Sequence, residues 1–230
     1  MKKFLCLLFV FSFFCISAYA GDYELIKVLG IQKSINDVGV KILNSNRIEK
    51  RIIFVYSKKE KKGILKSEHV LGKKQVVVYA DAYKSMANYD EIAAYLAREA
   101  AIVSRSYDGI FKGSLRSLQM KAAPKKFEIV ADKTAVDYMV NAGFNPIGLI
   151  TYLNKTCPQK KYDLISTKNL TSKRLATIYE YIYTKYPYFL VNNEYQNDFY
   201  YQNFLLTSQN NRRKLEKKIK SDSDEAVKYE

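Results

Sequence analysis

The most informative pattern in the sequence is AAYLAREAAIV, residues 93–103. This pattern predicts a helix. One face of the helix carries Ile92, Leu96, Glu99 and Val103, which follow one another at steps of four, three and four residues. Glu99 therefore lies in the apolar stripe of its own helix. An ionised carboxylate in that position is costly unless it is paired or hydrogen-bonded. The pattern predicts a buried glutamate that has a partner or a function.

The start of this helix is marked by Asn88, with Glu91 three residues later, which is an N-cap signature. We expect the helix to run to about Ser106. Upstream, apolar residues at helical spacing predict a helix over residues 22–44. Runs of β-branched and aromatic residues predict strands over residues 51–57 and 74–80, and the charged residues 58–63 predict a turn after the first strand.

A second long helix begins at Pro124, which suits a first helical position, and ends before Gly143, which suits a C-terminal stop. It carries Glu128 and Asp132, four residues apart and therefore on one face. Further helices are predicted after Asn145-Pro146 and from Thr171. The fold class that these elements predict is α+β and mainly helical, with a small sheet near the start of the chain.

Residues 1–20 have the composition of a secretory signal peptide. Two lysines precede an apolar run over residues 4–16, and Ala18-Tyr19-Ala20 offers a small-x-small cleavage pattern. The apolar run is shorter than the roughly 20 residues that span a bilayer, which disfavours a membrane anchor. We expect cleavage after Ala20 and a periplasmic or secreted protein.

The mature chain is strongly basic and has a single thiol, Cys157, so no internal disulfide is expected. Losing the two lysines of the signal lowers the formal net charge from +15 to +13. Such a charge favours acidic partners, among them an anionic envelope surface, while nucleic acid is not expected outside the cell. We divide the mature chain into a domain over residues 21–190 and a tyrosine-rich, basic C-terminal segment over residues 191–230. Residues 208–230 are expected to be a solvated helix or a disordered tail.

Three features stand in a recognisable order. They are Asp90-Glu91-Ile92-Ala93-Ala94 before the Glu99 helix, the Glu128–Asp132 pair, and the turn Ala142-Gly143-Phe144-Asn145-Pro146. This order resembles the HtpX-like and CAAX-prenyl-protease-like zinc metalloendopeptidases, over residues 50–185. The resemblance implies a zincin-like metallopeptidase domain with a small antiparallel or mixed sheet beside the active-site helix. It also implies that Glu99 corresponds to the general base of the family and Glu128 to its third zinc ligand.

The chain departs from the family at the metal ligands. Arg98 and Ile102 stand where the resemblance places the two histidines of the His-Glu-x-x-His motif. Residues that would support the ligands by hydrogen bonds in the family correspond to Asp132, Lys168 and Arg174, with Lys168 in a histidine position. The single histidine of the chain, His69, lies outside the motif positions, and we do not expect it to bind metal.

Catalytic zinc needs three protein ligands and an open position for water. A guanidinium has no free lone pair and stays charged, and isoleucine offers no ligand atom. We therefore expect no metal and no cofactor. Because no ion balances the charge of the retained glutamates, we expect the Arg98 guanidinium to bridge Glu128, and also Glu99 or Asp132.

The function that follows is an exported pseudopeptidase of bacterial type that binds protein or peptide without catalysis. The first alternative is an active metalloendopeptidase with unusual carboxylate ligands, with zinc or a harder cation as cofactor. The second alternative is a basic envelope-binding module whose peptidase fold is incidental.

Overall fold

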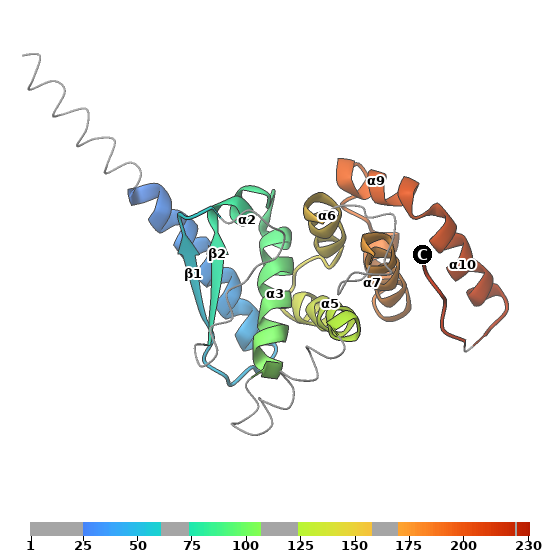
Figure 1. Cartoon of the computed structure of the whole chain (residues 1–230), viewed down its shortest axis with the longest axis horizontal. Coiled ribbons are helices and arrows are strands. Elements are labelled where there is room, and N and C mark those ends of the chain that lie inside the picture. Colours follow the sequence, from blue (N-terminus) through green and yellow to red (C-terminus); the bar gives the residue numbers. More distant parts are fainter. Residues whose placement is uncertain (1–24, 61–73, 107–123, 158–169, 224) are drawn as a thin grey trace, which may run out of the picture.

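The computed structural model describes residues 25–60, 74–106, 124–157, 170–223 and 225–230. The predictions for the signal segment, His69 and Lys168 concern residues outside these ranges. The first described helix spans residues 25–45. It is followed by β1 (Ile53–Ser57), β2 (Gln75–Tyr79), α2 (Ala80–Lys84), α3 (Tyr89–Ser106), α5 (Pro124–Asn141), α6 (Ile147–Thr156), α7 (Thr171–Lys185), α8 (Tyr188–Val191), α9 (Phe199–Thr207) and α10 (Gln209–Lys220) (Figure 1).

The mainly helical fold with a small sheet is confirmed, but the expected direction of the strands is wrong. β1 and β2 pair in parallel, with Ile53 opposite Gln75 and Ser57 opposite Tyr79. The expectation of an antiparallel or mixed sheet came from the resemblance to the metalloendopeptidases, not from the strands themselves. The whole connection comprises residues 58–74, which exceeds the dozen or so residues that a parallel crossover needs.

The two outer edges of this sheet have different hydrogen-bond partners. On β1, the Gln32 side chain donates to the Phe54 carbonyl (2.9 Å) and accepts from the Tyr56 N–H (2.7 Å), so an amide of helix 25–45 replaces a neighbouring strand. On β2, the Val77 carbonyl accepts from the Tyr95 hydroxyl of α3 at 3.2 Å. The outer edge of β1 is therefore closed by a side chain, and α3 lies beside the edge of β2.

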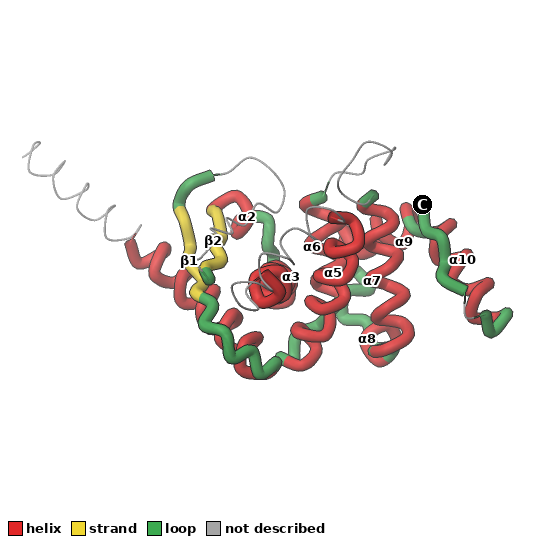
Figure 2. Tube along the Cα trace, turned by 60° about the horizontal axis from the view of Figure 1, so that its bottom comes forward, coloured by secondary structure: helices red, strands yellow, loops and turns green. Residues whose placement is uncertain are grey.

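Helix α3 is the centre of the molecule. It contacts β2 on one side and both α5 and α6 on the other, and Figure 2 looks nearly along its axis between these layers. Every residue from Glu91 to Ala101 is buried. The predicted N-cap is confirmed, because the Glu91 N–H donates to the Asn88 side chain at 3.0 Å. A helix so enclosed keeps any charged side chain along its middle out of water.

Turn residues place α6 against α3. The predicted stop of α5 is confirmed, because Gly143 has a φ of 70°, which glycine adopts at little cost. Asn145 then starts α6: its side chain accepts from the Ile147 N–H (3.0 Å), and its own N–H donates to Asp90 of α3 (3.0 Å). The loop thereby fixes the approach of α6 to the start of α3.

The C-terminal segment packs onto the same core. Tyr195, Tyr201 and Phe204 belong to the buried cluster that contains the α3 and α6 residues. The predicted helix within residues 208–230 is confirmed as α10, which contacts α7 and α9. After it the chain returns, and the buried Tyr229 donates to Glu180 of α7 at 3.0 Å. Within the described residues, no helix has the length and apolar character that crossing a membrane requires.

Candidate functional site

Helix α3 carries two charged residues into the interior. Arg98 is 7% exposed and Glu99 is fully buried, although both occupy the middle of a helix enclosed by apolar neighbours. The Arg98 Nη1 donates to Glu99 Oε1 at 3.1 Å. The predicted inward position of Glu99 is thus confirmed, and the residue beside it turns inward as well.

Helices α5 and α7 complete the site. Asp132 of α5 accepts from Arg98 Nε at 3.0 Å, and from Nε and Nη2 of Arg174 at 2.8 Å each. The Arg174 Nη1 also forms an ion pair with Glu128 Oε1 at 3.2 Å. Two guanidinium groups and three carboxylates from three helices therefore form one arginine–carboxylate cluster. It consists of Arg98, Glu99, Glu128, Asp132 and Arg174.

Electrostatics keep both arginines charged in this buried position. Burial alone would lower the pKa of Arg98, but the neighbouring carboxylates, Asp132 first, outweigh it and leave that pKa raised. The same balance, again dominated by Asp132, raises the pKa of Arg174 well above its ordinary value. The guanidinium groups are therefore permanent positive charges, and each is tied to carboxylate oxygens by charge-assisted hydrogen bonds.

Polarisable and aromatic groups border the cluster. The Cys157 thiol lies 3.7 Å from Arg174 Nη1, and burial raises the pKa of that thiol despite the arginines nearby. Tyr95 and Tyr152 pack edge to face with ring centroids 6.0 Å apart, and burial is the main cause of the raised pKa of each phenol. These groups stay neutral at physiological pH, so the thiol is protonated and a poor nucleophile.

The structure brings together most of the residues that the sequence singled out. The predicted ion pair of Arg98 is confirmed for Asp132 and Glu99. Glu128 forms an ion pair with Arg174, a pairing that the sequence did not predict, and it also contributes to raising the pKa of Arg98. Ile102 is half-buried one turn after Arg98 on α3.

Sequence reasoning missed the central position of Arg174, although a signal was present. Arg174, Ile178 and Ile182 follow at steps of four on α7, and all three are buried. The argument applied to Glu99 would therefore have placed Arg174 on an inward face as well. Cys157 was treated as an isolated thiol, because only the three-dimensional fold brings the end of α6 to α7.

The residues present do not fit a catalytic zinc ion. Within the described ranges, no group of three or more histidine, cysteine, aspartate or glutamate side chains could hold a metal. The carboxylate oxygens of Asp132 instead accept hydrogen bonds from both arginines. The cluster can hold three helices together and can fix charges, but it offers no ligand set for activating water.

Comparisons of the chain with models of protein families, with curated proteins and with solved structures found no match.

Proposed function

We propose that this chain is an exported, catalytically inactive metalloendopeptidase-like protein that binds extended peptide. The observation that carries the proposal is the arginine–carboxylate cluster at the position where the resemblance expects the metal centre. Arg98 stands at the first histidine position and donates to Asp132, whereas Glu99 and Glu128 are retained around it. The chain keeps the carboxylates of a zincin-like site and replaces the ion with guanidinium groups.

This arrangement supports binding without hydrolysis. Peptide hydrolysis by this class of site needs a metal that lowers the pKa of water to about 7. Without it, Glu99 has no activated water to deprotonate, and its carboxylate is already engaged by Arg98 at 3.1 Å. The alternative of an active enzyme with carboxylate ligands requires the arginines to leave oxygens that they contact at 2.8–3.2 Å.

The edge of β2 is the surface that we propose for peptide binding. The Ile53 N–H donates to the Lys74 carbonyl, so the main-chain N–H and C=O groups of even-numbered β2 residues point toward β1. The main-chain groups of Val77 therefore point away from β1, toward the outer edge. The Tyr95 bond to the Val77 carbonyl agrees with that orientation. Extended peptides add to such edges through main-chain hydrogen bonds. The β1 edge is less suited, because Gln32 fills both a carbonyl and an N–H there, whereas on β2 Tyr95 bonds to the Val77 carbonyl, which keeps a second lone pair for a peptide N–H.

Amide hydrogen exchange tests the binding edge directly. A reduced, carboxymethylated extracellular protein serves as the extended-chain probe. We expect the Val77 amide to gain protection when the probe binds, while the Tyr56 amide, already bonded to Gln32, changes little. Gln32→Ala is the matched control because it opens β1 and leaves β2 intact. Unchanged Val77 exchange at saturating probe, or no binding at all, would refute the proposal.

Restoring the histidines tests the origin of the site separately. The double variant Arg98→His/Ile102→His places two imidazoles one turn apart on α3, with Glu128 across from them on α5. If the cluster occupies a former metal centre, the folded double variant will bind one zinc per chain, and each single variant will bind far less. A folded double variant without zinc would contradict the resemblance. Zinc and peptide cleavage in the unaltered protein would favour the active alternative.

A further inference from the structure

Helix α10 carries six basic residues and one acidic residue, Glu216, and its basic residues divide into two groups. The first group turns toward the protein. Lys214 pairs with Glu230 at 2.6 Å, Lys218 pairs with Glu180 of α7 at 3.1 Å, and Arg212 donates to the Leu205 carbonyl at 2.8 Å. These three cations hold α10 and the C-terminal residues against the domain.

The second group faces solvent. Arg213, Lys217 and Lys220 follow at steps of four and three, so they share one face of the helix, and all three are exposed. None of them forms an ion pair or a side-chain hydrogen bond within the described part of the chain. We call these three residues the basic row. Its charges are available to a partner, in contrast to those of Lys214 and Lys218.

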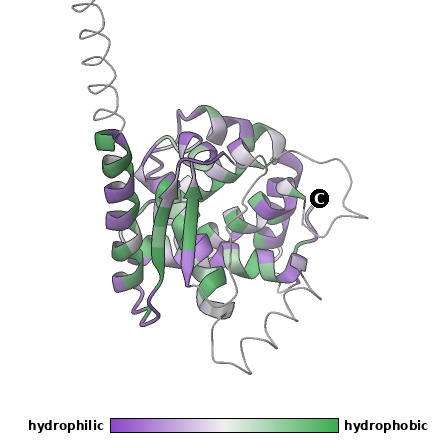
Figure 3. Ribbon diagram, turned by 60° about the vertical axis from the view of Figure 1, so that its left-hand side comes forward, coloured by the Kyte–Doolittle hydropathy of each residue, from purple (hydrophilic) through white to green (hydrophobic). Residues whose placement is uncertain are grey.

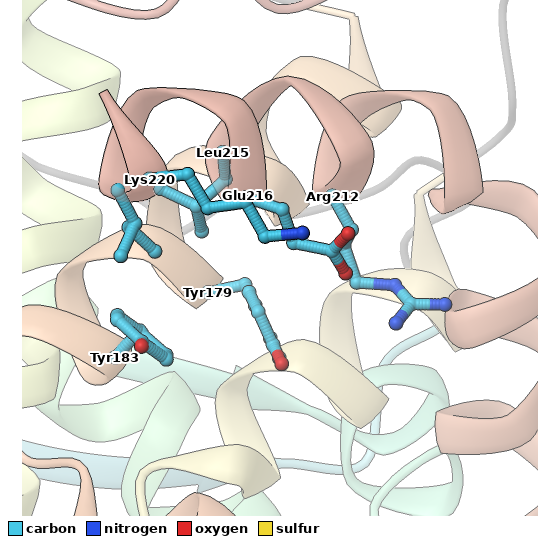
Figure 4. A pocket seen from close by; sticks show the side chains of 7 residues that line it. Tyr179, Tyr183, Arg212, Leu215, Glu216 and Lys220 are labelled. Carbon is cyan, nitrogen blue, oxygen red and sulfur yellow. The ribbon is translucent and has the colours of Figure 1, made fainter.

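A groove of about 240 Å³ lies beside the basic row, between α7 and α10. Its apolar lining comes from Tyr179, Tyr183, Leu215 and Ile219, and its polar lining from Arg212, Glu216 and Lys220 (Figure 4). Tyr183 and Ile219 are 40% and 42% exposed, so the groove opens an apolar surface next to the cations. Lys220 belongs to both the groove and the row.

We propose that this face docks onto anionic phospholipid headgroups, with phosphates at the basic row and with Tyr183 and Ile219 entering the interfacial layer. A basic amphipathic helix lies in a membrane surface with cations toward headgroups and apolar side chains below them. Tyrosine favours that layer because its ring is apolar and its hydroxyl polar. The formal net charge, +15 for the whole chain and +13 without residues 1–20, adds attraction to the anionic surface. This inference is independent of peptide binding at β2.

The charge pattern on α10 provides a matched test of the row. Arg213→Gln/Lys217→Gln and Lys214→Gln/Lys218→Gln each remove two positive charges from the same helix, so the net charge of the two variants is identical. Each cation at an anionic membrane surface strengthens binding about fivefold, so the first variant should bind roughly 25-fold more weakly. In the second variant Arg212, the buried Leu215 and Tyr229 still hold α10 and the C-terminal residues against the domain, so its binding should stay within about twofold of that of the unaltered protein.

Co-sedimentation with vesicles measures the effect. The probes are vesicles of phosphatidylcholine with and without phosphatidylglycerol, inorganic phosphate as a soluble competitor, and polyglutamate as an acidic polymer. We expect binding only to phosphatidylglycerol vesicles, reduced by salt and unaffected by millimolar phosphate. Absence of that binding, or equal losses in the two variants, would overturn the proposal. Binding to polyglutamate without vesicle binding would overturn it in favour of an acidic protein partner.

Fluorescence tests the apolar part of the surface. The chain has no tryptophan, so Ile219→Trp introduces a single fluorophore beside the groove. On phosphatidylglycerol vesicles its emission should shift to the blue as the ring leaves water. Val40→Trp, at a 51% exposed position on helix 25–45, is the control and should not shift. Equal emission shifts in the two variants, or no shift of Ile219→Trp when the protein binds the vesicles, would refute the proposed orientation on the membrane.

Discussion

Asp132→Asn should be among the most destabilising single substitutions in this chain. The change keeps the size of the side chain but removes the charge that two buried guanidinium groups share. Asp132 is 1% exposed and accepts three hydrogen bonds, at 2.8, 2.8 and 3.0 Å. The introduced amide also turns N–H donors toward arginine donors. We therefore expect both arginines to lose their main partner at once.

The magnitude follows from the contacts and their burial. Hydrogen bonds to charged groups contribute about 1.5–3 kcal/mol each, so the sum over the three bonds is an upper bound on the loss in the free energy of unfolding. Glu99 and Glu128 still pair with the arginines, and the Asn oxygen keeps part of the acceptor capacity. We expect a loss of about 3–5 kcal/mol in the free energy of unfolding, as for other broken buried ion pairs. For a chain of this size that lowers the Tm by about 10 °C.

Asp137→Asn is the matched control on the same helix. Asp137 also accepts from three donors, Tyr181, Lys185 and Tyr186, but its side chain is 28% exposed. Water can replace those partners, so we expect a loss of about 1 kcal/mol. Urea unfolding followed by circular dichroism compares the two variants, with a lower midpoint and an unchanged slope for Asp132→Asn. Equal losses in both would show that buried charge does not hold the cluster together.

Three further predictions concern the fold. Gly39→Ala places a Cβ 2.4 Å from the Phe54 ring and should lower the free energy of unfolding by about 1–3 kcal/mol. Gly30→Ala, whose Cβ meets no atom within 4 Å, should raise the free energy of unfolding by about 0.5–1 kcal/mol. Thermal unfolding of both variants measures the difference. Gln32→Ala should cost about 1–2 kcal/mol and increase amide exchange in β1, and unchanged exchange there would contradict the closed edge. Burial raises the pKa of Tyr201 to about 12, so its contribution to stability is complete below pH 10 and is lost between about pH 10 and 12. Tyr201→Phe should therefore remove part of the tyrosinate absorbance that appears near pH 12, and a loss confined to pH 10 would refute this.

Local patterns predicted most of the elements because they depend on nearby residues. The N-cap at Asn88, the stop at Gly143 and the inward face of Glu99 are all encoded within one or two turns of helix. Strand direction was not predictable in this way, because it depends on the path of residues 58–74 rather than on either strand. Helix periodicity alone, by contrast, shows that Arg174 lies on the buried face of α7.

The choice of partners within the cluster depends on the crossing of three helices. Period and spacing indicated that Glu128 and Asp132 share a face of α5, but not which arginine reaches each of them. Arg98 reaches Asp132 from α3, and Arg174 reaches both carboxylates from α7. Such pairings are set by where α3 and α7 meet α5, and that information is distributed over the whole core. The sequence therefore predicted the ionic character of the site better than its connections.

Chelation provides the last prediction, and it follows from a comparison of charges. The two guanidinium groups carry the same formal charge, +2, as the zinc ion that the resemblance expects, and they tie α3, α5 and α7 together by directional hydrogen bonds. A covalently attached cation cannot be extracted, so the Tm of the purified protein should be the same with and without EDTA. A metal bound at this site would instead stabilise the folded state by mass action, and EDTA would lower the Tm. A clear fall, reversed by added zinc, would show that the arginines do not replace the ion.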